Sequence, residues 1–156
     1  MKNFKLAIYF IIYLCVSLLA IADSGSHLYT SERLASNKTT CIIQDKYGFI
    51  WIGTEYGLNK FDGYRFTHYL TDINDSTSII SNDITSFLVD KKGQFWIGSE
   101  QGLMKYNYKN NDFKRYHCPD GNTPRIETIL EMSNGDIFTA TAGYGLYKIS
   151  KGTDKI

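Results

Sequence analysis

A sequence repeat with a period of 45 residues, runs of β-branched and aromatic residues of strand length, and turn residues between these runs predict an all-β fold. The fold we expect is a partial β-propeller of about three four-stranded antiparallel blades, at residues 36–70, 81–117 and 124–150. Aromatic residues make up 15% of the chain whereas Pro occurs only twice, a composition typical of short strands joined by tight turns. We therefore interpret residues 23–156 as one propeller segment that follows a leader at residues 1–22.

The repeat is carried by turn residues and by an apolar strand that contains tryptophan. Trp51 in the first copy and Trp96 in the second lie in strands that are apolar on both faces, and such strands must be covered on both sides. Stacked blades provide this cover, so we expect both tryptophans in the blade core and not on a sugar-stacking platform. The aspartates and glycines of the repeat are expected to cap turns or to permit close packing. The structural repeat positions are Asp45, Gly48, Trp51, Gly53, Gly57, Asp90, Gly93, Trp96, Gly98, Gly102, Gly135 and Gly145.

The third copy of the repeat is degraded. Asn134-Gly135 takes the turn position, and Phe138-Thr139-Ala140-Thr141 replaces the run that starts with tryptophan in the first two copies. Three blades are fewer than the four to eight with which propellers close. We therefore expect the remaining blades of a longer parent chain to be a partner of this segment.

The first 22 residues have the layout of a secretory signal peptide. Lys2 and Lys5 give a positive start, residues 6–21 are almost wholly apolar, and Ala20-Ile21-Ala22 supplies small residues at a cleavage site. An uncleaved membrane anchor is the alternative, but the apolar stretch is short for a membrane span. The sequence thus predicts export from the cytoplasm.

Charge and cysteine content exclude several functions. The chain has 17 Lys+Arg against 16 Asp+Glu and no basic stripe, so nucleic acid is not an expected partner. Cys41 and Cys118 remain after the leader, and a buried free thiol is the preferred interpretation of Cys41 over a disulfide. Three scattered histidines form no catalytic or metal-binding pattern, so we expect no catalytic residue, no metal and no cofactor.

Residues 36–69, from Ser-Asn through Gln-Asp-x-x-Gly-Phe-Ile-Trp-Ile-Gly-Thr to Gly-Leu-Asn-Lys-Phe-Asp-Gly-Tyr, resemble the two-component regulator propeller repeat. The second copy departs little from this pattern, and the third is weak. The resemblance implies the N-terminal periplasmic sensor region of a hybrid two-component histidine kinase, anchored in the inner membrane by its parent chain. It also implies an oligosaccharide ligand and a homodimeric parent. The chain contains no phosphoacceptor histidine box and no glycine-rich ATP site, so it is not expected to be an enzyme itself.

Any ligand is expected on loops at one end of the central channel. The candidates follow the Gly-Thr strand of each copy: Glu55, Tyr56, Glu100, Gln101 and Tyr144. Two other functions stay open. One is a propeller lyase resembling the streptogramin lyases, which need catalytic His and Glu and a divalent metal. The other is an inactive truncated gene product.

Overall fold

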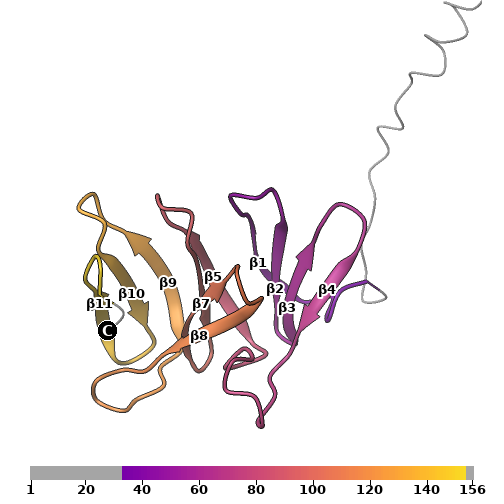
Figure 1. Cartoon of the computed structure of the whole chain (residues 1–156). Helices are drawn as coiled ribbons and strands as arrows, with labels where there is room; N and C mark the ends of the chain where they lie inside the picture. The colour runs from indigo at the N-terminus through magenta and orange to yellow at the C-terminus, as the bar shows by residue number, and fades with distance from the viewer. Residues whose placement is uncertain (1–32, 154–156) are drawn as a thin grey trace, which may run out of the picture.

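The computed structural model describes residues 33–153, in which eleven strands form three antiparallel sheets (Figure 1). The predicted signal peptide at residues 1–22 lies outside the described residues. The first sheet has the order β1-β2-β3-β4 and the second β5-β6-β7-β8. Their strands are β1 (Thr39–Gln44), β2 (Ile50–Thr54), β3 (Gly57–Phe61), β4 (Phe66–Tyr69), β5 (Ile84–Val89), β6 (Phe95–Ser99), β7 (Gly102–Asn107) and β8 (Asp112–Tyr116).

The third sheet has three strands, with the order β11-β10-β9. They are β9 (Ile126–Glu131), β10 (Ile137–Thr141) and β11 (Gly145–Ile149). The sequence predicts four strands for this blade, whereas its sheet has three strands within residues 33–153. After β11 the chain turns, because Thr153 donates its N–H and its hydroxyl to the carbonyl of Ser150.

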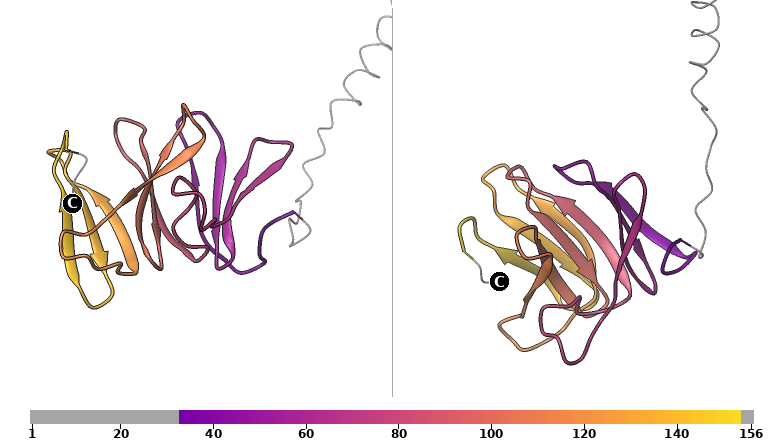
Figure 2. Two further views of the ribbon diagram at one scale, coloured as in Figure 1. Left: turned by 60° about the horizontal axis from the view of Figure 1, so that its bottom comes forward. Right: turned by 45° about the vertical axis from the view of Figure 1, so that its right-hand side comes forward.

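The three sheets stack face to face, as the two views in Figure 2 show. The first strands of neighbouring sheets, β1, β5 and β9, lie beside one another. The last strands, β4 and β8, are therefore the outer strands. This is the arrangement of propeller blades around a channel, so the all-β partial propeller predicted from the sequence is confirmed.

A buried aspartate organises the first turn of blades one and two. Asp45 Oδ1 accepts hydrogen bonds from the N–H groups of Tyr47 and Phe49, at 2.9 and 3.0 Å. Its Oδ2 accepts one from the indole Nε1–H of Trp51 at 2.8 Å. Asp90 repeats all three bonds in blade two, including one from Trp96 at 3.0 Å. The aspartate therefore closes the turn and satisfies the only polar group of the buried tryptophan.

A hydroxyl closes the second turn of each blade. Thr54, Ser99 and Thr141 each donate a hydrogen bond of 2.8 Å to the carbonyl of the glycine that starts the next strand. Gly57 and Gly102 adopt φ values of 138° and 127°, which side chains with a Cβ rarely adopt. The Thr/Ser-to-Gly spacing of the repeat thus encodes a tight turn between the second and third strands.

The core consists of two interfaces between blades, built from equivalent positions of the repeat. Blade one places Trp51 and Leu58, both fully buried, against blade two. Blade two places Trp96 and Leu103 in the same way against blade three. The facing residues of blade two are Ile84, Phe95, Ile97, Met104, Tyr106 and Phe113, whereas those of blade three are Ile126, Ile129, Ile137 and Ile149.

Gly53 and Gly98 are packing residues within extended strands and do not lie in turns. A Cβ on Gly53 would lie 2.6 Å from Sγ of Cys41 and 2.7 Å from a methyl group of Ile84 in the next blade. A Cβ on Gly98 would lie 2.7 Å from the corresponding Ile126. The glycine of Trp-Ile-Gly-Thr therefore lets the first strand of the next blade approach closely.

The third blade has lost the aspartate and the tryptophan together. Its strand pairing places Met132 where Asp45 and Asp90 stand, and Phe138 where the tryptophans stand. A phenyl ring has no N–H to be satisfied, so the acceptor for the indole is no longer needed once tryptophan is gone. The weakness of the third copy of the repeat is thus a linked pair of changes at one interaction.

The two end sheets expose residues of the kind that fill the interfaces between blades. Leu146 of blade three is 69% exposed, although it stands where Leu58 and Leu103 are fully or almost fully buried. Leu130 of blade three and Ile42 of blade one are also mainly exposed. Both outer faces therefore have the composition of an interface between blades, and within residues 33–153 they lack the cover that the inner faces have.

No helix among residues 33–153 is long and apolar enough to span a membrane.

Candidate functional site at the loop end

The candidate ligand residues gather at one end of the propeller segment, which we call the loop end. It comprises the turns at 55–56, 100–101 and 142–144 together with the long connections 70–83 and 117–125, at the bottom of Figure 1. The alternating directions of the strands place all five segments at the same end. The opposite end, the turn end, carries the turns at 45–49, 90–94 and 132–136.

Two exposed tyrosines are the largest side chains among the predicted ligand residues. Tyr56 is 64% exposed and Tyr144 is 53% exposed, although the turns that carry them are tightly closed. Glu55 forms a 2.9 Å ion pair with Lys38, which raises the pKa of that lysine. The loop end therefore presents aromatic faces beside charged groups, held on short rigid turns.

Arg125 connects blade three to blade two at this end. Its guanidinium forms ion pairs with Glu100 and with Asp83, the latter at 3.6 Å, and its Nε lies 3.2 Å from Glu127. The hydrogen bond to Glu100 is the main reason that the pKa of Arg125 is raised above its ordinary value. One cation thus lies among three carboxylates, which leaves the region acidic and holds Glu100 in place.

A groove of about 500 Å³ lies beside Gln101, between that turn and the connection 70–83. Arg115 forms one wall and holds the connection by donating hydrogen bonds to the carbonyls of Asp75, Ser78 and Ile79. The connection also pairs with the outer strand, since the N–H of Phe113 donates to the carbonyl of Thr77. The connection is thus fixed in shape by hydrogen bonds to Arg115 and to the outer strand.

The remaining polar candidates form no catalytic arrangement within the described residues. His68 and His117 are both exposed, and Nδ1 of His68 lies 2.8 Å from Oδ1 of Asn59. Residues 33–153 contain no group of three or more His, Cys, Asp or Glu side chains placed to hold a metal ion. Cys41 and Cys118 are free thiols, and burial raises the pKa of Cys41 to about 11.

Sequence reasoning found the turns of the loop end but missed its ion pairs and its groove. Arg125 and Asp83 are 42 residues apart, and nothing in the repeat pattern marks the arginine. One signal was available: Lys38, Asp83 and Arg125 share one repeat position, because the carbonyl of each accepts a hydrogen bond from the turn of its own blade. A charged residue therefore stands at the same position of the loop end in all three blades.

Comparison with known proteins agrees with this geometry. Residues 33–56 and 78–101 match the family model for the two component regulator propeller, and these segments span the first turn and the tryptophan strand of blades one and two. These two segments therefore have the sequence of two-component regulator propeller repeats. Over 48 residues, 31% of this chain, the sequence is 48% identical to histidine kinase P4 of Formosa agariphila, and the match covers 4% of that protein.

Solved structures with the same fold include extracellular domains of two component systems. The extracellular domain of the hybrid two component system BT3049 of B. thetaiotaomicron is similar over 80% of this chain, with 29% identity and a TM-score of 0.71. That of BT4673 from the same organism is similar over 80%, with 25% identity and a TM-score of 0.65. A streptogramin B lyase shares the fold alone, at 16% identity and a TM-score of 0.51. This chain spans 19% and 17% of the two ectodomains.

Proposed function

We propose that this chain is part of the exported, ligand-sensing propeller of a two-component sensor and has no catalytic activity of its own. The observation that carries the proposal is the similarity, at 29% identity and over 80% of the chain, to the extracellular domain of a hybrid two-component system. The exposed ion pairs and exposed tyrosines of the loop end support a binding role, because they offer polar groups and aromatic faces to a ligand. They do not combine a nucleophile with a base in contact, which covalent catalysis would need.

The proposed partner of the segment is a set of further blades. Leu146 on blade three stands at a position that is buried at both internal interfaces. Leu130 on blade three and Ile42 on blade one stand at positions that are partly or fully buried there. Burying these side chains would remove apolar surface from water at about 25 cal/mol per Å². Additional blades of the same repeat supply the matching face, which is why we assign this segment to a longer ring.

The proposed ligand is an oligosaccharide that binds at the loop end, with Tyr56 and Tyr144 as its aromatic contacts. Tyrosine suits this task because its ring packs on the apolar face of a sugar while its hydroxyl remains hydrogen-bonded. Glu55, Glu100 and Gln101 supply polar groups for sugar hydroxyls. The signal would then pass to the rest of the parent chain. We propose that the parent is a homodimer anchored in the inner membrane and that its propeller lies in the periplasm.

Substitution of one tyrosine tests the loop end. In a propeller completed with the parent's remaining blades, Tyr56→Ala should weaken binding of the oligosaccharide that triggers the sensor at least tenfold, measured by titration calorimetry. Tyr64→Ala is the matched control, because Tyr64 is 90% exposed but lies in the β3–β4 turn at the opposite end. Equal affinities for both variants and the unsubstituted protein would refute the assignment of the site.

The lyase alternative makes a different prediction. A propeller lyase would consume a cyclic ester substrate in the presence of a divalent metal, and metal removal would abolish that activity. The sensor proposal predicts that the completed ring binds its ligand unchanged in the presence of a chelator and returns it unmodified.

A further inference from the structure

The interface between blades two and three contains a pocket where the preceding interface is filled by aromatic rings. Trp51 packs on Phe95 and Tyr106 of blade two, with ring centroids 4.8 and 4.7 Å apart, and Tyr108 extends this aromatic layer. Blade three carries smaller or longer aliphatic side chains at the corresponding positions, namely Ile137, Ile149 and Lys151. Because two isoleucines do not fill the volume of two aromatic rings, a cavity of about 250 Å³ remains next to Trp96.

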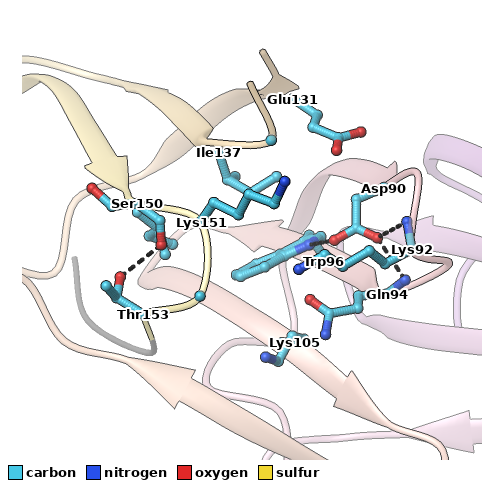
Figure 3. Close-up of a pocket in the computed structure, with 13 residues that line it drawn as sticks. Asp90, Lys92, Gln94, Trp96, Lys105, Glu131, Ile137, Ser150, Lys151 and Thr153 are labelled. Carbon is cyan, nitrogen blue, oxygen red and sulfur yellow. Dashed lines mark hydrogen bonds between the residues drawn. The ribbon is translucent and has the colours of Figure 1, made fainter. Parts of the chain in front are cut away.

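The cavity opens at the turn end and is lined by hydrogen-bond donors. Lys92, Lys105 and Lys151 contribute to its wall, together with the amide of Gln94 (Figure 3). Lys105 is held in place, since its Nζ lies 5.1 Å from the centre of the Trp96 ring. Lys151 lies along Gly135, where a Cβ would be 3.0 Å from its Cδ. The lysines are thus partly positioned by the fold before any ligand arrives.

The two acidic side chains in the lining are already engaged by N–H donors. Asp90 accepts from the indole of Trp96 and from the backbone N–H groups of Lys92 and Gln94. Glu131 accepts from the backbone N–H of Lys91 at 2.9 Å. These carboxylates hold the turn and keep their negative charges, so the three lysines of the first cavity exceed its acidic side chains by one.

A second cavity, of about 350 Å³, adjoins the first, because Gln94 and Lys105 line both. Its lining adds Lys46, Lys109 and Lys114 and includes no acidic side chain. Six different lysines therefore surround two adjoining cavities at the turn end. A cluster of positive charge in a cleft raises the local concentration of anions.

We propose that these adjoining cavities, which we call the lysine groove, bind the carboxylate or sulfate groups of an acidic oligosaccharide. Lys92, Lys105 and Lys151 would contact one anionic group in the first cavity, while the lysines of the second cavity contact the next group along the chain. That the carrier of the anions is a saccharide rests on the proposed function, whereas recognition of the anionic groups rests on the groove alone. The groove lies at the end of the segment opposite Tyr56.

Binding measurements with charged and neutral probes test this inference. The full 156-residue chain is expressed, its product is purified, and binding is measured by calorimetry for oligogalacturonate, a sulfated carrageenan oligosaccharide and neutral cellohexaose. We expect the two acidic probes to bind and cellohexaose not to bind. Raising the salt concentration from 50 to 300 mM should weaken the acidic probes at least fivefold, because exposed charges are screened. Absence of binding by both acidic probes would overturn the proposal.

Substitution of two adjacent lysines distinguishes binding in a defined groove from non-specific attraction to positive charge. Lys92→Gln and Lys151→Gln should each weaken acidic probes at least fivefold, whereas Lys91→Gln should change the affinity less than twofold. Lys91 belongs to the same turn as Lys92 but does not line the groove, so the two variants lose the same charge. Equal losses for the two would show that the groove does not define a site. Lys151→Tyr, which restores the aromatic residue of the preceding interface, should also abolish binding in the first cavity.

The outcomes separate this inference from the proposed function. A neutral oligosaccharide that responds to Tyr56→Ala, together with acidic probes that do not bind, would support the loop end as the sensing site and refute the lysine groove. Acidic probes that respond to Lys92→Gln but not to Tyr56→Ala would support the lysine groove, whatever the loop end binds.

Discussion

The bond between Asp45 and Trp51 gives a stability prediction that the structure makes quantitative. Asp45→Asn keeps Oδ1 as an acceptor for two backbone N–H groups but replaces Oδ2 with an amide that cannot accept from the indole. Leaving the buried indole N–H unsatisfied costs about 1–3 kcal/mol, and weakening the two bonds to a charged group adds to this. We expect Asp45→Asn to lower the free energy of unfolding by about 2–4 kcal/mol.

Trp51→Phe should cost a similar amount, because it removes buried volume and leaves a carboxylate oxygen without its partner. The two residues interact directly at 2.8 Å, so their effects should not add. The double variant should be more stable than the sum of the single losses predicts, by about 1–2 kcal/mol. Blade three already carries the paired replacement, Met132 with Phe138.

The assay is urea unfolding of each variant, followed by far-UV circular dichroism so that the loss of tryptophan fluorescence does not matter. Asp62→Asn is the matched control. Asp62 also caps a turn, through the N–H groups of Tyr64 and Arg65, but it is exposed and bonds no indole. Asp62→Asn should lower the free energy of unfolding much less than Asp45→Asn, and its effect should add to that of Trp51→Phe. Additive losses for Asp45→Asn and Trp51→Phe would refute the reasoning.

Three further predictions concern the packing between blades. Gly53→Ala should lower the free energy of unfolding by about 1–3 kcal/mol, because the new Cβ would lie 2.6–2.7 Å from Cys41 and Ile84; an unchanged urea midpoint would contradict this. Leu58→Ala should cost about 2–5 kcal/mol, whereas Leu146→Ala, at the same repeat position but 69% exposed, should cost far less; comparable losses would show that the exposed face is already packed. Cys41, whose pKa is raised to about 11, should react with iodoacetamide at pH 8 roughly 100-fold more slowly than a thiol of ordinary pKa. The stability that the neutral thiol contributes should be lost as pH rises from about 9 to 11. Cys41→Ser is the control for both measurements.

Much of the fold followed from the sequence because the repeat encodes local structure three times. The turn residues and the alternation around Trp51 placed the strands, and a strand apolar on both faces implied a stack of blades. The role of Asp45 was understood only in part: a cap could be inferred from Asp at a turn, but the bond to the indole six residues later depends on the path of the chain. Close packing at Gly53 could likewise be inferred only in general terms, because its contact with Ile84 depends on the position of the next blade.

The candidate site was less accessible to sequence reasoning. Short turns such as Glu55-Tyr56 could be assigned to one end of the blades, since each follows the same strand. The ion pairs of Arg125 join residues far apart in the chain, and no local pattern indicates them. The lysine groove arises from what blade three lacks, the rings of Phe95 and Tyr106, so it becomes visible only when the two interfaces between blades are compared.

The most direct test of the account is the association state of the chain from residue 23 onward. The account holds that the outer faces of blades one and three are interfaces without their cover, so residues 23–156 should associate with rising concentration in sedimentation velocity experiments. Leu130→Ser combined with Leu146→Ser should shift the equilibrium towards monomer, whereas Ile73→Ser should not, because Ile73 is 99% exposed on a connection outside these faces. A monomeric chain with a sharp, reversible thermal transition would contradict the account.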